Sequence, residues 1–245
     1  MTWQPKKFST EERFEIANKI LIELIKQYKQ NLLSVALEGS TAKGLDGPES
    51  DLELRVVIKE RESSLEAFFY KGMFVGINFR SPEKMISKAK NIELEWSVKS
   101  DVLYTCKVLY DLTNFYVELR ETVKEAEELI DLNSLFKDAI TDMYEHVYKL
   151  FLLSETVTII AQEARLVAYW AVMSVGLKNK HTFLSSRIIY KECFELDSLT
   201  EAFEQRIRGL VSLKTDVQNL KKNVGELWVA TLNWAGISKK DLSFL

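Results

Sequence analysis

Apolar residues recur at helical spacing near the start of the chain. They follow one another mostly three or four residues apart, which places them on one face of a helix; these residues are Phe14, Ala17, Leu21, Leu24, Ile25 and Tyr28. Just before them, Ser9-Thr-Glu-Glu12 is a capping-box pattern, in which side chains satisfy free backbone N–H groups at a helix start. The pattern predicts an amphipathic helix over residues 10–30.

Three short apolar segments then indicate strands. Residues 32–38 (LLSVALE) form an apolar run suited to a buried strand, and residues 51–59 (DLELRVVIK) alternate as a strand does. Residues 73–79 (MFVGINF) are predicted to be the third strand. Ser81-Pro82 predicts a helix start, because Ser is a favoured N-cap and Pro fits the first helical position.

Beyond about residue 113 the apolar pattern is helical throughout. Gly becomes rare there, and helical spacing predicts one helix around residues 135–151, a very apolar one over 157–177 and one or two more within 198–235. The sequence therefore predicts an α+β fold. A domain with a small mixed β-sheet and flanking helices is expected over residues 1–125, and an all-α helical bundle over residues 126–245.

Composition and charge exclude several protein classes. The 245 residues are 47% hydrophobic and 28% charged, which excludes a disordered chain, and the net charge of −3 argues against a broad nucleic-acid surface. Cys106 and Cys193 cannot form a disulfide framework, so a reducing cytoplasm is the expected compartment. The first fifteen residues lack the apolar core of a signal peptide, and the longest apolar stretch, residues 166–177, is too short to span a bilayer. We expect a soluble cytoplasmic protein with neither a nucleic-acid nor a membrane partner.

The turn-rich stretch after the first predicted strand carries the elements of an anion site. Gly39-Ser40 follows this strand directly, and glycine lets backbone N–H groups approach a ligand without a Cβ in the way. If Thr41 and Ala42 open a helical turn, their free N–H groups and the Ser40 hydroxyl can bind a phosphate. Lys43 adds a positive charge nearby.

Two carboxylates follow on the next predicted strand. Asp51 and Glu53 are two residues apart, so both project from the same face. Neighbouring carboxylates repel unless a cation bridges them, and hard oxygen ligands beside phosphate oxygens suit Mg²⁺. A Gly-Ser turn alone is weak evidence, and Asp-x-Glu on a strand is often only a solvated face. Together, however, they supply what phosphoryl or nucleotidyl transfer requires.

The stretch from Gly39 to Glu53, GSTAKGLDGPESDLE, resembles the signature of the polymerase-beta-type nucleotidyltransferase superfamily. Its second half is similar in particular to the kanamycin nucleotidyltransferase family, whose members modify aminoglycosides at the 4' position. Weaker similarity continues at residues 75–79, 95–96, 144–149 and 175–177. The resemblance implies transfer of a nucleoside monophosphate from ATP or another NTP to a hydroxyl of a small molecule. An aminoglycoside acceptor, and hence antibiotic resistance, is the specific expectation.

The resemblance also implies roles for individual residues. Gly39, Ser40 and Lys43 would bind the nucleotide, and Asp51 and Glu53 would be catalytic and hold Mg²⁺ against the triphosphate. The family further implies a homodimer, with the active site near the subunit interface.

A second pair of residues matches the family on a predicted helix. Glu145 matches the carboxylate that acts as general base toward the acceptor hydroxyl, and Lys149 matches a lysine that contacts the phosphates. The two are four residues apart and therefore share a helix face. The alternative is an exposed ion pair at this spacing, which is a very common pattern.

One position departs from the family. Where the family has a third carboxylate on the following strand, this chain has Gly76. Three interpretations stay open. The chain is a nucleotidyltransferase that modifies a small molecule, or a nucleotide-binding module with impaired catalysis, or an enzyme of the same chemistry with another acceptor, such as a lincosamide, a sugar or a protein side chain.

Overall fold

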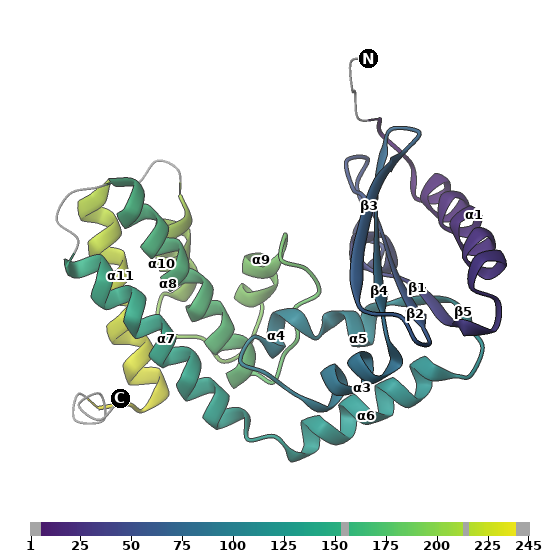
Figure 1. Ribbon diagram of the computed structural model, residues 1–245. Coiled ribbons are helices and arrows are strands. Elements are labelled where there is room, and N and C mark those ends of the chain that lie inside the picture. The colour runs from purple at the N-terminus through teal and green to yellow at the C-terminus, as the bar shows by residue number, and fades with distance from the viewer. Residues whose placement is uncertain (1–5, 153–156, 213–215, 239–245) are drawn as a thin grey trace. The chain divides into compact units, whose positions relative to one another are not determined.

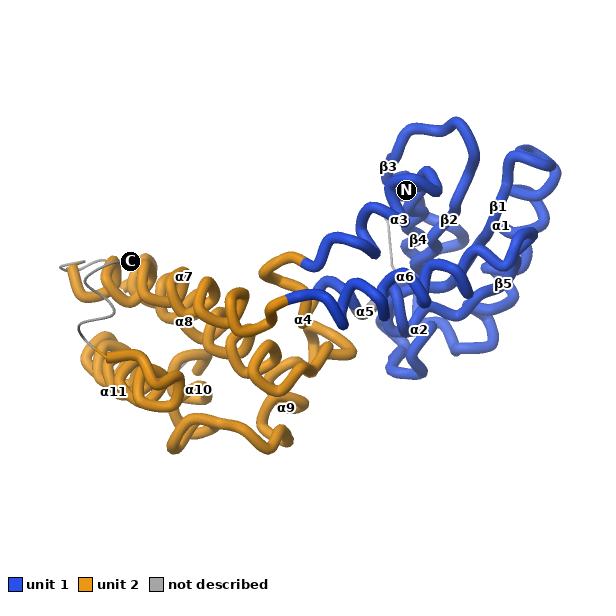
Figure 2. Tube along the Cα trace, turned by 90° about the horizontal axis from the view of Figure 1, so that it is seen from below, with its two compact units in different colours: residues 1–92, 99–130 blue, residues 93–98, 131–245 orange. Residues whose placement is uncertain are grey.

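The computed structural model describes residues 6–152, 157–212 and 216–238 and divides the chain into two compact units. Unit 1 comprises residues 1–92 and 99–130, and unit 2 comprises residues 93–98 and 131–245 (Figure 2). Unit 1 contains the sheet and unit 2 is helical, so the predicted α+β class is confirmed. The sequence did not indicate that residues 93–98 belong to the helical unit. The division into domains at residues 125 and 126 stays a prediction.

Unit 1 is a five-stranded sheet with helices on both faces. Its elements are α1 (Thr10–Tyr28), η1 (Lys29–Asn31), β1 (Leu32–Leu37), α2 (Gly39–Lys43), β2 (Leu52–Ile58), β3 (Ser64–Tyr70), β4 (Met73–Arg80), α3 (Pro82–Lys90), α5 (Asp101–Thr105), β5 (Lys107–Asp111) and α6 (Phe115–Leu129). The strand order is β3-β4-β2-β1-β5. β2 and β4 are parallel, and the other neighbours are antiparallel.

Two strands were not predicted, and both lie at sheet edges. β3 pairs only with β4, and β5 pairs only with β1. Most of β3 is exposed, so burial imposes no alternation on its sequence, SLEAFFY. The segment predicted as the third strand is therefore the fourth, β4.

Each sheet face has its own apolar core beneath helices. Figure 1 shows α1 beside the sheet on one side and α3, α5 and α6 on another. On one face, Ile16 and Leu24 of α1 pack with the buried residues Leu54 and Val56 of β2. On the other face, helices α3, α5 and α6 contribute Met85, Leu103 and Leu119, which pack in one cluster with Ala36 and Val57. Successive side chains of a strand point to opposite faces of the sheet, so alternate residues of β2 pack in different cores.

The helix starts predicted from capping signals are confirmed. Ser9 Oγ accepts a hydrogen bond from the backbone N–H of Glu12 at 3.3 Å, and Glu12 Oε2 accepts one from the backbone N–H of Ser9 at 2.7 Å. Ser81 caps α3 in the predicted way, with Pro82 in the first turn.

Arg13 of α1 holds the turn that leads into β2. Its guanidinium is buried and donates to the backbone carbonyls of Phe8, Gly47 and Ser50 at 2.7 to 3.2 Å. It also forms a buried ion pair with Asp46, at 2.9 Å between Nη1 and Oδ2. Asp51 follows directly on Ser50, so this network determines where the carboxylate strand begins.

Unit 2 is helical throughout its described part. Its elements are α4 (Trp96–Lys99), α7 (Leu132–Leu152), α8 (Val157–Lys178), α9 (Ile189–Phe194), α10 (Phe203–Val211) and α11 (Val217–Ala235). α8 is the predicted very apolar helix, and near its end a Cβ at Gly176 would stand only 2.6 Å from Ser97 Oγ. Within the described ranges, no helix is both long enough and apolar enough to cross a membrane.

We expect Arg13→Ala to lower the free energy of unfolding by about 3–5 kcal/mol, because it removes the only cation paired with the buried Asp46 carboxylate in the described residues and the hydrogen bonds to three backbone carbonyls. Urea unfolding followed by circular dichroism measures this loss. Lys26→Ala is the control, since Lys26 pairs with Glu23 on the exposed surface and should cost less than about 1 kcal/mol. Equal losses in the two variants would contradict the structural role of Arg13.

Candidate active site

The predicted Gly-Ser bend forms the first two residues of α2, shortly after β1. The helical turn begins at Gly39, two residues earlier than the sequence suggested. Gly39 has φ of +63°, which disfavours other residues, and a Cβ there would collide with the Glu53 carboxylate. Glycine at this position therefore allows Glu53 to lie directly against the start of α2. Ser40 follows in the first turn of α2, and Lys43 lies in its last turn.

Glu53 is the second residue of β2, and Asp51, predicted to begin this strand, directly precedes it. Both are half-buried, whereas Leu52 and Leu54 between and after them are fully buried toward the α1 core. Burial raises the pKa of Glu53, and the negative charges of Asp51 and Glu38 raise it further. Lys43 and Arg55 oppose this pKa shift only in part. The site therefore carries more negative charge than its own cations neutralise.

A third carboxylate lies beside Glu53, but it has a partner. Glu38 ends β1 and accepts two hydrogen bonds from the Arg55 guanidinium, at 2.5 and 2.7 Å. Both side chains are buried, so this bidentate pair is a fixed part of the sheet face. Glu38 thus compensates the Arg55 charge and does not replace the carboxylate that the family has at Gly76.

Gly76 lies next to Glu53 in the sheet. The two residues are register partners in the parallel pair β2–β4. A Cβ at Gly76 would meet no atom within 4 Å, so the glycine is not required by packing. Glu95, which the sequence places near this region, belongs to unit 2 and accepts a hydrogen bond from Tyr169 at 2.6 Å.

The residues present fit a divalent cation completed by phosphate. Within the described residues there is no group of three or more His, Cys, Asp or Glu side chains able to hold a metal by themselves. Asp51 and Glu53 supply two hard oxygen donors, and the negative charges of Asp51 and Glu38 beside Glu53 favour a cation there. Such a site suits Mg²⁺ that brings further ligands with it.

Glu145 and Lys149 lie on α7 in unit 2, whereas Asp51 and Glu53 lie in unit 1. They form an exposed ion pair, and this hydrogen-bonded contact with Lys149 lowers the pKa of Glu145. The buried stripe of α7 faces away from them, through Ile140, Met143, Val147 and Leu150. The geometry is the common i,i+4 pair that the sequence also allowed, and the catalytic role of Glu145 stays a prediction.

Sequence reasoning missed the residues that support the site. Arg13 is three residues before Ile16 and four before Ala17, and therefore lies on the buried stripe of α1. Arg55 stands within an apolar strand on the same alternate positions as Glu53. A charged residue on a core-facing position was the available signal in both cases, because such residues are almost never buried without a partner.

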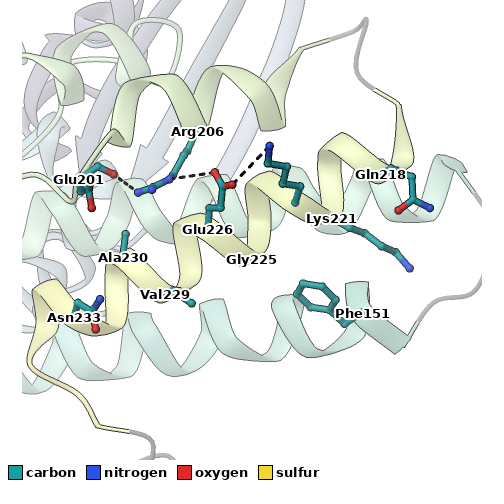
Figure 3. A pocket seen from close by; sticks show the side chains of 11 residues that line it. Phe151, Glu201, Arg206, Gln218, Lys221, Gly225, Glu226, Val229, Ala230 and Asn233 are labelled. Atoms are coloured by element: carbon teal, nitrogen blue, oxygen red, sulfur yellow. Dashed lines mark hydrogen bonds and ion pairs between the residues drawn. The ribbon is translucent and has the colours of Figure 1, made fainter.

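An open hollow of about 720 Å³ occurs in unit 2 (Figure 3). Residues of α10 and α11 line most of it, together with Phe151 of α7, and none of them is a predicted site residue. Its charged groups compensate one another, since Glu226 pairs with both Arg206 and Lys222. This hollow therefore lacks the chemistry of the candidate site.

Comparison with known proteins places the chain among nucleotidyltransferases. It is 20% identical to aminoglycoside nucleotidyltransferases (4') from Staphylococcus aureus and from a Bacillus species, over 91% of this chain and 90% of each relative. A solved nucleotidyltransferase-like protein from Exiguobacterium sibiricum shares the fold, with a TM-score of 0.51 at 9% identity, covering 94% of this chain and 78% of that one. These matches confirm the resemblance expected from residues 39–53. Residues 113–241, more than half of the chain, match the KNTase C-terminal domain, and the chain therefore belongs to this kanamycin nucleotidyltransferase-like family.

Proposed function

We propose that the protein is a Mg²⁺-dependent nucleotidyltransferase that transfers a nucleoside monophosphate from ATP or another NTP to a hydroxyl of a small molecule. The main support is the position of Glu53 directly against Gly39, with Asp51 close enough to raise the pKa of Glu53, which burial also raises. The named relatives are aminoglycoside nucleotidyltransferases, which makes an aminoglycoside, and with it antibiotic resistance, the first acceptor class to test.

Asp51 and Glu53 hold Mg²⁺ in this proposal. When bound, Mg²⁺ neutralises phosphate charge and makes the α-phosphorus more electrophilic. Gly39 and Ser40 contribute backbone N–H groups and a hydroxyl to the phosphates, and Lys43 adds a cation on the same short helix. The buried Glu38–Arg55 pair keeps the neighbouring part of the sheet face neutral and leaves Glu53 to the cation.

The reaction forms one bond and breaks another. The acceptor oxygen attacks the α-phosphorus, and the bond from this phosphorus to the oxygen bridging to the β-phosphate breaks, so that pyrophosphate leaves with the electron pair. The hydroxyl proton passes to the Glu145 carboxylate. If Lys149 binds a phosphate oxygen, as the family resemblance implies, it leaves Glu145, whose pKa then rises toward its ordinary value and makes it a better base.

Cytoplasmic location and a homodimer with the active site near the subunit interface complete the proposal. The cytoplasmic location rests on the cysteine content, and the homodimer rests on the family resemblance.

A second candidate function is nucleotide binding with impaired catalysis. Gly76 favours it, because the carboxylate expected beside Glu53 is absent although space for it exists. Such a module would bind Mg-ATP and release no pyrophosphate with any of the aminoglycoside, lincosamide and sugar acceptors in a screen.

Asp51→Asn is expected to weaken Mg-ATP binding and to reduce pyrophosphate release by roughly a thousandfold or more, because one of two metal-holding carboxylates is lost. Titration calorimetry with Mg-ATP and a coupled pyrophosphate assay measure the two effects. Glu62→Gln removes an exposed carboxylate of the same unit and should change neither. Mg-ATP binding that is unchanged in Asp51→Asn would overturn the proposal.

Glu145→Gln is expected to lower kcat by roughly a hundredfold or more while Mg-ATP affinity is retained, since a general base acts only in the chemical step. The matched control is Glu204→Gln, because Glu204 forms the same exposed i,i+4 pair with Arg208 on α10. If both variants keep wild-type turnover, the Glu145–Lys149 pair is only a surface ion pair.

The raised pKa of Glu53 predicts an effect on stability. The folded chain binds this proton more tightly than the unfolded chain, so stability falls as pH rises from the ordinary value of 4.5 through the raised pKa. Without Mg²⁺, Glu53→Gln should therefore have a higher Tm than the wild type at neutral pH. The difference should vanish well below pH 4.5, where the carboxyl is protonated in both states. A wild type more stable than this variant at neutral pH would contradict the electrostatic argument.

A further inference from the structure

The sheet face that carries the candidate carboxylates continues across β4 and β3. Glu53 is paired with Gly76, and Gly76 with Ala67. Leu52 is paired with Val75 in the same parallel pair. The residues just before them, Asp51 and Phe74, therefore come side by side, one row nearer the start of β2. Phe74 in turn pairs with Phe69 of β3. The side chains of register partners share a face, which gives two adjacent rows: Asp51–Phe74–Phe69 and Glu53–Gly76–Ala67.

An aromatic pair therefore borders the metal-binding carboxylates. The rings of Phe69 and Phe74 meet edge to face, with centroids 5.5 Å apart. Phe74 is 43% exposed and Phe69 is 52% exposed. Large apolar side chains that gather at an accessible place beside polar catalytic groups are typical of a ligand-binding surface.

The sheet order separates this surface from the proposed phosphate site. β4 and β3 lie on one side of β2, whereas β1, from which α2 follows, lies on the other. A triphosphate held at α2 leaves the β4 side of Asp51 and Glu53 for the acceptor. Neighbouring strands are about 4.8 Å apart, so a molecule with its hydroxyl at β2 reaches β3 within about 10 Å.

The charges on the two rows that begin at Asp51 and Glu53 indicate which kind of acceptor fits beside them. The four positions that continue the two rows are occupied by uncharged residues, namely Gly76, Ala67, Phe69 and Phe74. On the following row Arg55 is compensated by Glu38, which lies on the other side of Glu53, next to it on the β1 side. Glu66 of β3 is paired with Ile77, which packs in the core on the α1 side, and so belongs to the opposite face. With Asp51 and Glu53 occupied by Mg²⁺, these rows of β4 and β3 offer a polycation no further carboxylate.

We propose that the acceptor is an uncharged molecule with a hydroxyl-bearing part joined to a flat apolar part, which packs on Phe74 and Phe69. This inference rests on the proposed nucleotidyl transfer and specifies its substrate class. The absence of a side chain at Gly76 opens a flat path between the carboxylates and the aromatic pair. The bond changes are those given above: the acceptor hydroxyl forms the new phosphoester bond, and pyrophosphate leaves.

Two matched probes test this class directly. 4-Nitrophenyl glucoside and methyl glucoside carry the same sugar hydroxyls and differ only in the aromatic group, and kanamycin serves as the cationic probe. Each is titrated by calorimetry into the full-length protein with Mg²⁺ and a non-hydrolysable ATP analogue. We expect the aryl glucoside to bind about five- to tenfold more tightly than the methyl glucoside and more tightly than kanamycin.

Three variants test which side chains contact the aryl group of the glucoside. Phe74→Ala should remove the preference for the aryl glucoside. Phe68→Ala is the matched control, because Phe68 is the adjacent residue to Phe69 on β3, is 38% exposed and lines a groove against α1 on the opposite sheet face. Gly76→Glu adds a carboxylate without a clash and should shift the preference toward kanamycin.

Several results would overturn the inference: equal binding of the two glucosides, no binding of either, tighter binding of kanamycin by the wild type, or a loss caused by Phe68→Ala alone. Weaker binding of the ATP analogue in Phe74→Ala, with aryl glucoside binding unchanged, would assign the ring to the nucleobase and equally overturn it. Loss of ATP-analogue binding in Asp51→Asn is measured separately. ATP-analogue binding that depends on Asp51, together with equal binding of the two glucosides, would contradict the acceptor class alone. Absence of ATP-analogue binding in the wild type would instead contradict the proposed nucleotidyl transfer.

Discussion

The buried Arg13 guanidinium connects helix α1 to the turn from which the carboxylate strand starts. It binds the carbonyls of Gly47 and Ser50 and the carboxylate of Asp46, all within 3.2 Å. A buried cation must be matched by acceptors in a fixed geometry, because each lost hydrogen bond leaves it without the solvation that water gave it. The turn is thus held at several points. Asp51 follows as the next residue, so its position depends on this network.

The same sheet distributes charge unequally between its two faces. Toward α1, β2 presents buried leucine and valine, and toward the other face it presents Glu53 and Arg55. Arg55 is compensated by Glu38, so Arg55 and Lys43 offset the neighbouring negative charge at Glu53 only in part. Burial and the charges of Asp51 and Glu38 therefore raise the pKa of Glu53, as often occurs at functional sites. A cation brought with a nucleotide offsets this negative charge, which links binding to stability.

Gly76 changes the character of the acceptor side without disturbing the fold. The glycine leaves space on the sheet face, and the register places Phe74 beside Asp51 and Phe69 beyond it. In our proposal, the chemistry of nucleotidyl transfer rests on the carboxylates of β2, and the choice of acceptor rests on the uncharged rows of β4 and β3. Relatives with this fold can therefore share a reaction and differ in their substrate, because the reaction and the substrate preference depend on side chains of different strands.

The sequence by itself determined the helices with capping signals, the central strands and the pairing of Asp51 with Glu53 on one face, because these follow from local spacing along the chain. It also carried the family resemblance in residues 39–53, which the comparisons confirm. Only the tertiary structure showed the edge strand β3, the Arg13 network and the Glu38–Arg55 pair. Each of these joins residues far apart in sequence, and the exposed edge strand lacks the alternation that burial imposes on a central one. The uncharged surface beside the carboxylates likewise depends on strand order and register, which no local pattern specifies.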